Sequence, residues 1–212
     1  MYYKYPRTYH LPWRLGISSD DKILNDISCF YNMDIIVTLK MDGENTSMYS
    51  DKIHARSIDS KDHISRHWIK TFWNNIKYDI PDGYRICGEN LYAKHSIKYE
   101  NLKSYFYGFS IWNETTCLSW DDTLDFFSLL SIEPVEVIYE GIFDRNKLIE
   151  LADNLDMNIN EGYVIRNKNS FNYSDFSSNV AKFVRKNHVQ SDVHWIHKEI
   201  ELNRMSKITK KF

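Results

Sequence analysis

The feature that most constrains the fold is a series of short strand-like runs, several of which follow one another closely. These runs are rich in β-branched and aromatic residues and lie at 34–40, 45–50, 84–91, 105–112, 135–139, 161–166 and 180–185. Helix-like stretches lie at 18–30, 63–77, 119–130, 144–155 and 188–203. Several intervals between strands are too short for the crossover that parallel neighbours need. The sequence therefore predicts a mixed α+β fold with largely antiparallel sheets flanked by helices.

Composition limits the class of protein. The chain has 212 residues, 42% hydrophobic and 15% aromatic, so it can bury a substantial core. We expect a single domain over 1–212, in which 188–212 forms a basic C-terminal helix and tail rather than a separate C-terminal domain. The apolar runs are too short to span a bilayer, and the N-terminus lacks a signal-peptide core. We expect a soluble, cytoplasmic or otherwise intracellular protein with no membrane partner.

Cysteines and charge narrow the classes further. Cys29, Cys87 and Cys117 are widely spaced, which favours reduced thiols over disulfides or a zinc site. The formal net charge of −2 gives no overall attraction to nucleic acid, so a polyanion would need a local basic surface. The basic stretch 182–211 is one candidate, although charge alone fits a solvated helix face equally well.

One lysine stands at the end of an apolar run. In "DIIVTLKMDGENTSMY", residues 34–49, Lys40 directly precedes an Asp-Gly turn signal, after which 45–49 is expected to return as the second strand of a hairpin. Alternation along a strand places Ile36, Thr38 and Lys40 on one face. An amphipathic lysine with its amine in water would explain the pattern. A desolvated lysine with a lowered pKa, ready for nucleophilic attack, would explain it too.

Five further stretches each combine an apolar strand with one polar or aromatic side chain. They are Arg56 in HARS, Glu89 in YRICGENLY, Phe109 in YFYGFSIW, Glu161 in NEGYVIR and Lys182 in NVAKFVRK. Each has a structural explanation alone, but several charges on apolar strands are costly to bury unless they meet each other or a ligand. A nucleotide would use them all, because phosphates need cations, ribose suits a carboxylate, a base stacks on an aromatic ring and a metal needs oxygen.

In this order the motifs resemble those of the covalent nucleotidyltransferases, which comprise polynucleotide ligases and messenger-RNA capping enzymes. The resemblance is carried by KMDGEN at 40–45, Arg56-Ser57, Gly88-Glu89, the aromatic segment ending at Phe109, Glu161-Gly162 and Lys182. DNA ligases and capping enzymes usually have arginine at the position of Asn45, whereas RNA ligases have asparagine. The chain is therefore most similar to ATP-dependent RNA ligases, over residues 34–186.

The resemblance implies a role for each residue. Lys40 would attack the α-phosphate of ATP and hold AMP through a P–N bond. The other nucleotide contacts would be Asn45, Arg56 at the ribose or the RNA phosphate end, Glu89 at a ribose hydroxyl, Phe109 stacked on adenine, Glu161 at a divalent metal through water, and Lys182 at the α-phosphate. The last motif departs from the family, since Val184 stands where a second lysine is common. Lys186, one pleat further on, is a weaker substitute for that lysine.

The expected function is therefore RNA ligation, in RNA repair. The enzyme would use ATP with Mg²⁺ or Mn²⁺ and join a 5′-phosphate RNA end to a 3′-hydroxyl end through a lysyl-adenylate. The alternatives are a DNA ligase, a GTP-using capping enzyme, or an inactive RNA-binding module of the same fold. Nicked duplexes, single strands and broken hairpins all remain open as RNA substrates, as does a protein partner.

Two minor patterns have simpler explanations. His63 and His67, like His194 and His197, have a spacing that could bind zinc, but no third ligand is evident, so structural histidines are favoured. The segment 65–68 (Ser-Arg-His-Trp) could instead line an RNA groove.

Overall fold

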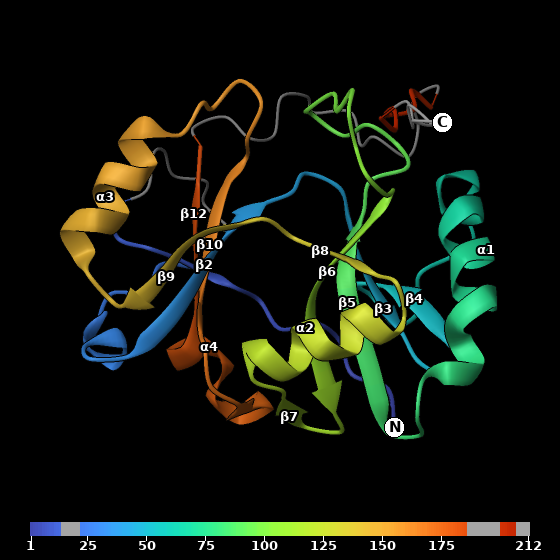
Figure 1. Ribbon diagram of the computed structural model, residues 1–212, viewed down its shortest axis with the longest axis horizontal. Helices are drawn as coiled ribbons and strands as arrows, with labels where there is room; N and C mark the ends of the chain where they lie inside the picture. The colour runs from blue at the N-terminus through green and yellow to red at the C-terminus, as the bar shows by residue number, and fades with distance from the viewer. Residues whose placement is uncertain (14–21, 186–199, 207–212) are drawn as a thin grey trace, which may run out of the picture.

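Two β-sheets form the centre of the molecule, with helices on their outer sides (Figure 1). The structure is a computed structural model that describes residues 1–13, 22–185 and 200–206. The first sheet has the strand order β1-β12-β10-β2-β9, formed by Tyr9–His10, Val180–Val184, Gly162–Asn167, Asp34–Lys40 and Val137–Ile142. The second has the order β11-β7-β6-β5-β3-β4, formed by Phe171–Asn172, Thr116–Cys117, Phe106–Asn113, Tyr84–Asn90, Glu44–Met48 and Ile53–Ala55, with β8 (Glu133–Pro134) beside β6.

Most strand pairs are antiparallel. Among the described residues, β1–β12 and β6–β8 are the parallel pairs within the named strands. The prediction of an α+β fold with largely antiparallel sheets flanked by helices is thus confirmed, and each of the seven predicted strands has a counterpart at nearly its expected position.

Three predicted helices are present close to their expected positions, as α1 (His67–Ile76), α2 (Trp120–Leu129) and α3 (Arg145–Asn154). The short α4 (Phe176–Asn179) was not predicted. Ser119 caps α2 by accepting a hydrogen bond from the Asp122 amide, and Asp144 caps α3 in the same way. In Figure 1, α3 covers the outer face of the first sheet, and α1 lies on the opposite side of the molecule, against the second sheet.

The alternation along β2 divides its side chains between two cores. Ile35 and Val37 point outward and pack under α3 with Leu148, whereas Ile36 points inward and packs with Leu91 of the segment after β5. A second inner cluster, around Trp112 and Phe176, fills another part of the space between the sheets. Because β2 is buried on both sides, its last residue, Lys40, emerges at a well-fixed point between the sheets.

The predicted hairpin at the lysine motif is wrong. β2 pairs with β9 and β10, while β3 crosses into the other sheet and pairs with β4 and β5. Gly43 permits this crossing, since a Cβ there would lie 2.5 Å from the Asn90 carbonyl oxygen and 2.7 Å from the Leu91 side chain. The Asp-Gly pair therefore marks a close approach of two chain segments and not a two-residue turn.

Two helix predictions differ from the structure. Of the predicted helix 18–30, residues 22–27 are not helical and only Ser28–Phe30 form a 3₁₀ turn. Asp26 binds the backbone and hydroxyl of Ser28, a local arrangement that competes with helical hydrogen bonding. Of the predicted helix 188–203, residues 188–199 lie outside the described part, and 200–203 are extended because they bind the 91–105 loop.

Candidate active site

A cavity of about 260 Å³ lies between the two sheets and collects residues from distant parts of the chain. Six of the eight predicted site residues line it, namely Lys40, Asn45, Arg56, Glu89, Phe109 and Lys182. Glu161 contacts Lys40. Lys186 lies outside the described residues. The structure therefore brings together every predicted site residue that it describes.

Lys40 and Glu161 form an ion pair at the end of the first sheet. Lys40 Nζ donates to Glu161 Oε2, and the side chains are 23% and 7% exposed. The pair forms because Gly162, next to Glu161, lies directly opposite Lys40 in the β2–β10 register. Residues 121 positions apart in sequence are thus placed in contact by strand pairing.

The charge state of Lys40 differs from the sequence expectation. Burial lowers the pKa of Lys40, as predicted, but the nearby carboxylates of Glu161, Glu89 and Asp42 oppose burial, and the net result is a raised pKa. In the ligand-free protein Lys40 is therefore an ammonium, because the carboxylates outweigh the desolvation that alone would lower its pKa. The proton has to leave before Lys40 can act as a nucleophile.

Asp42 fixes the segment that follows Lys40. Its Oδ2 accepts hydrogen bonds from the Ser96 amide at 2.8 Å, the Ser96 hydroxyl at 2.6 Å and the Ile97 amide at 2.7 Å, and its own amide donates to the Tyr99 hydroxyl. A carboxylate with three donors holds the backbone strongly. Asp42 is thus an anchor for the end of β2 and so for the position of Lys40.

Glu89 is a carboxyl group held largely in its neutral form. It faces Asn45 across the β3–β5 pair and accepts a hydrogen bond from the Gly43 amide at 3.2 Å. Burial raises the pKa of Glu89, Lys40 lowers it, and Glu161 and Asp42 raise it again, to about 8. At pH 7 a protonated Glu89 can donate a hydrogen bond as well as accept one.

This shift predicts a pH dependence of stability. Because the folded pKa of Glu89 is about 8 against an ordinary 4.5, the unfolded chain releases this proton first, and stability falls as pH rises between these values. The slope of this contribution is at most about 1.4 kcal/mol per pH unit. Glu89→Gln removes this pH-dependent contribution. Urea unfolding at several pH values should therefore show the free energy of unfolding of the variant rising relative to that of the wild type as pH increases. A constant difference would contradict the assignment.

The wall expected to hold the base is aromatic. Phe109, on β6, is half-buried and meets the Tyr5 ring edge-on, with 5.2 Å between ring centroids. Arg166 lies beside it, buried, and donates to the carbonyl oxygens of Phe109 at 3.4 Å and Leu118 at 2.7 Å. Arg166 therefore joins β10 of the first sheet to the second sheet and holds the backbone of Phe109.

Asn45 carries an unsatisfied polar atom at the cavity. Its Oδ1 is buried and accepts no hydrogen bond from the described residues. Buried polar atoms are rarely left without a partner, so this oxygen is suited to a donor on a bound molecule. A nucleotide, with ribose hydroxyls and an aromatic base, offers such donors.

The cavity is much more positive than the protein as a whole. Its charged lining residues are Arg7, Lys40, Arg56, Arg166 and Lys182, against the single carboxyl group of Glu89. The whole chain, in contrast, has a formal net charge of −2. A cavity with this imbalance favours an anionic ligand, and arginine and lysine together suit phosphate groups.

The second cation of the last motif is absent at its usual place. Val184 is only 2% exposed and packs in the protein interior, so no cation reaches the cavity from this position. Arg185 is also buried and donates to the Met157 carbonyl at 2.7 Å, on a different side from Lys182.

Sequence reasoning missed the N-terminal wall and Arg166. Tyr5, Pro6, Arg7, Thr8 and His10 all line the cavity, although β1 has only two residues and shows no strand periodicity. The tyrosine-rich run "YYKYPRTYH" is the one signal that this segment covers apolar surface. Arg166 lay within a predicted strand, where a buried arginine bound to carbonyl groups leaves no local pattern.

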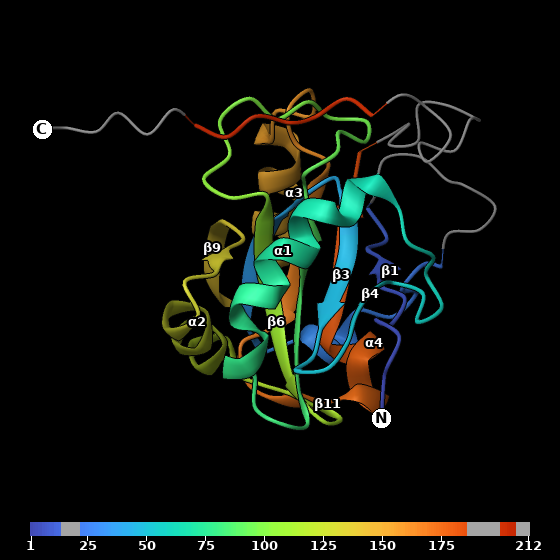
Figure 2. The same cartoon turned by 90° about the vertical axis from the view of Figure 1, so that its right-hand side faces the viewer.

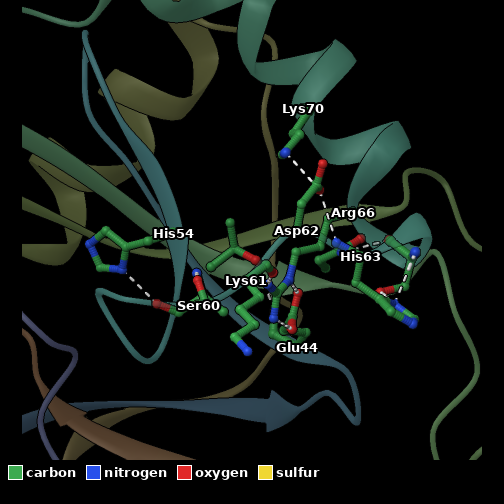
Figure 3. A network of polar contacts seen from close by, with 12 residues as sticks. Glu44, His54, Ser60, Lys61, Asp62, His63, Arg66 and Lys70 are labelled. Carbon is green, nitrogen blue, oxygen red and sulfur yellow. Dashed lines mark hydrogen bonds and ion pairs between the residues drawn. The ribbon is translucent and has the colours of Figure 1, made fainter. Parts of the chain in front are cut away.

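A separate polar cluster lies beside β3 and is shown in Figure 3. Arg66 donates to both carboxylate oxygens of Glu44 and to the Lys61 carbonyl, and Lys70 donates to Asp62 at 2.7 Å. Because Glu44 precedes Asn45 in β3, this pair fixes the start of the motif strand. The cation of Arg66 is thus engaged within the protein.

The alternative RNA groove at 65–68 is therefore not favoured. Ser65 is buried and Trp68 stacks on Phe72, so these side chains belong to the packing of α1. His63 precedes α1, where it accepts a hydrogen bond from the Ser65 amide. Within the described ranges, no group of three or more His, Cys, Asp or Glu side chains could hold a metal, and no helix is long and apolar enough to cross a bilayer.

Comparison with solved structures finds a similar fold in several ligases. A Naegleria gruberi RNA ligase variant with ATP and Mn matches with a TM-score of 0.53 and 16% identity, over 80% of this chain and 55% of that one. An archaeal ATP-dependent RNA ligase matches with a TM-score of 0.58 and 14% identity, over 85% and 48%. A putative ATP-dependent DNA ligase from Aquifex aeolicus matches with a TM-score of 0.51 and 18% identity, over 75% and 46%.

These similarities establish that the chain shares its fold with these ligase structures. The chain belongs to the RNA ligase family, whose sequence profile matches residues 33–184. It spans about half the length of the solved structures that it resembles. The search of curated proteins gave no match.

Proposed function

We propose that this protein is an ATP-dependent RNA ligase that acts through a covalent lysyl-adenylate at Lys40. The observation that carries the proposal is the position of Lys40 in a positively charged cavity, within a family match that spans 33–184. In the first step, Lys40 Nζ bonds to the α-phosphorus of ATP, and the bond from that phosphorus to pyrophosphate breaks. The ammonium of Lys40 loses a proton before the attack. The carboxylate of Glu161, to which Lys40 Nζ donates a hydrogen bond, is in place to accept that proton.

The next two steps transfer AMP and seal the RNA. An oxygen of the RNA 5′-phosphate attacks the same phosphorus and releases Lys40. The 3′-hydroxyl then attacks the 5′-phosphorus, forms the phosphodiester bond and expels AMP. In both steps the cations of Arg56 and Lys182 suit the negative charge on the phosphoryl oxygens.

The other residues would position the nucleotide. Phe109 offers a half-buried ring for the base, Glu89 a carboxyl group for the ribose, and Asn45 Oδ1 an acceptor with no partner in the described residues. The hard carboxylate oxygens of Glu161, which contacts Lys40, suit Mg²⁺ or Mn²⁺ bound through water. When bound, such an ion would neutralise charge on the nucleotide phosphates.

The proposal is tested by incubating the protein with α-labelled ATP or GTP and a divalent ion. We expect ATP to give an acid-labile label on the protein. Added pyrophosphate should remove this label, and added 5′-phosphorylated RNA should accept it. A label from GTP would indicate a capping enzyme, and preferential transfer to DNA would indicate a DNA ligase. RNA binding with no label from either nucleotide would favour an inactive RNA-binding module.

A further comparison distinguishes between the three possible RNA substrates. Transfer and joining are measured on a nicked duplex, a single strand and a broken hairpin, each with 5′-phosphate and 3′-hydroxyl ends. If added protein fractions increase the joining of RNA ends but not the labelling of this protein by ATP, a protein partner contributes to RNA binding.

A further inference from the structure

The N-terminal segment forms part of the cavity although it lies outside the family match. Residues 5–8 and His10 line the cavity, whereas the RNA ligase profile matches 33–184. In Figure 2 this segment runs from the N-terminus past α4 to β1 along one side of the molecule. It therefore adds to the site a wall that the matched motifs do not include.

This segment is fixed on both sides of the cavity. On the N-terminal side of the cavity-lining residues, the Tyr3 amide donates to the Tyr49 hydroxyl at 2.8 Å and the Tyr3 carbonyl accepts from Arg85 at 2.8 Å. After it, the Leu11 amide donates to the Lys182 carbonyl at 2.8 Å, and β1 pairs with β12 so that His10 lies opposite Lys182.

Further contacts fix the middle of the segment. The Tyr5 ring meets the rings of Phe109 and Phe176 edge-on, at 5.2 and 5.4 Å between centroids. Pro6 restricts its own φ angle. Arg7 follows directly and lines the cavity with an exposed side chain. Its backbone is therefore held in place at the cavity before any ligand binds, which reduces the entropy lost on binding.

Charge indicates what Arg7 would bind. The cavity has five basic side chains and one carboxyl group, and Val184 removes the cation that the last motif usually supplies. We propose that Arg7 is a phosphate-binding residue of this cavity, which contacts the phosphates of ATP or the 5′-phosphate of the RNA end. Its planar guanidinium can form two parallel hydrogen bonds with a phosphate group. This inference rests on the proposed function for the identity of the phosphate, but not for the site itself.

The test compares Arg7→Ala and Arg7→Lys with Lys4→Ala. Lys4 is exposed on the same segment but does not line the cavity, so it controls for loss of a nearby charge. One arm measures the KM for ATP in labelling of Lys40. The other measures AMP transfer from the pre-labelled protein to 5′-phosphorylated RNA.

We expect Arg7→Ala either to raise the KM for ATP or to slow AMP transfer to RNA, by about tenfold or more, because a charge-assisted hydrogen bond is lost. Arg7→Lys should recover part of this loss. A raised KM for ATP assigns the contact to the nucleotide phosphates, and slower transfer at unchanged KM assigns it to the RNA end. Lys4→Ala should stay within about twofold of the wild type. If Arg7→Ala matches Lys4→Ala in both arms, the inference is wrong.

Binding separates this inference from the proposed function. If the wild type takes up no label, ATP and inorganic pyrophosphate are titrated against the wild type and Arg7→Ala by calorimetry. Weaker binding to Arg7→Ala would then support the phosphate contact even though ligation is excluded. Equal binding, or no binding to either protein, would overturn it.

Discussion

Lys40→Arg is expected to abolish labelling by ATP while the protein stays folded. The arginine keeps a positive charge beside Glu161, Glu89 and Asp42, the carboxylates that raise the pKa of Lys40. A guanidinium does not lose its proton in the accessible pH range, so it has no lone pair to attack phosphorus. We expect no detectable label and a change in the free energy of unfolding below about 1 kcal/mol.

Lys40→Ala gives a different pattern, which serves as a control. It also removes the nucleophile, but it leaves the carboxylate of Glu161, whose side chain is only 7% exposed, without its cation. Breaking a buried ion pair in this way costs roughly 3–5 kcal/mol. Because Lys40 is partly exposed, we expect the lower end of that range. Lys40→Ala/Glu161→Gln should regain stability in urea unfolding, yet remain unlabelled. Labelling of Lys40→Arg would place the nucleophile elsewhere.

The protonation state of Lys40 bears directly on the labelling step. In the ligand-free protein the raised pKa keeps Lys40 protonated near neutral pH, so the ammonium must lose its proton during nucleotide binding before the amine can attack. The apolar strand that ends in Lys40 predicted that this side chain is partly desolvated, which the structure confirms. It could not predict the direction of the pKa shift, because Glu161, directly before β10, and Glu89, in β5, lie far away in sequence.

The same limit explains the other differences between sequence and structure. Strand β2 was predicted at its observed bounds, because a β-branched run and its alternation are local properties. The pairing of β3 was not, since Asp42-Gly43 has the local chemistry of a turn, while the fold uses Gly43 for contact with Asn90. The contribution of Tyr5 and Arg7 was invisible because a two-residue strand has no period.

The motif order was therefore more informative than the local patterns around it. Each motif by itself had a structural explanation, but the structure gathers Asn45, Glu89 and Phe109 around one cavity with Lys40. Strand register causes this convergence, since Asn45 faces Glu89 and Lys40 faces Gly162. Precise register should then be the property on which the site depends most.

Gly162→Ala tests this dependence and is expected to be the most destabilising single methyl addition in the first sheet. Gly162 has φ +150°, and an added Cβ would lie 2.0 Å from the Phe183 carbonyl oxygen. That oxygen belongs to the backbone of β12, so relief requires β12 to move away from β10. This movement would displace Lys182 from Val164, its partner in the register. It would also shift Glu161, which directly precedes the substituted residue.

Gly141→Ala is a closely matched control for this variant. Gly141 lies in the same sheet with φ +148°, but its added Cβ would meet the Tyr139 hydroxyl oxygen at 3.0 Å, the end of a flexible side chain. We expect Gly141→Ala to lose about 1–2 kcal/mol of unfolding free energy, for backbone strain alone. Gly162→Ala should lose at least about 2 kcal/mol more, because strand pairing is disturbed as well. Urea unfolding of both variants measures the difference, and equal losses would show that the β10–β12 register tolerates the methyl group.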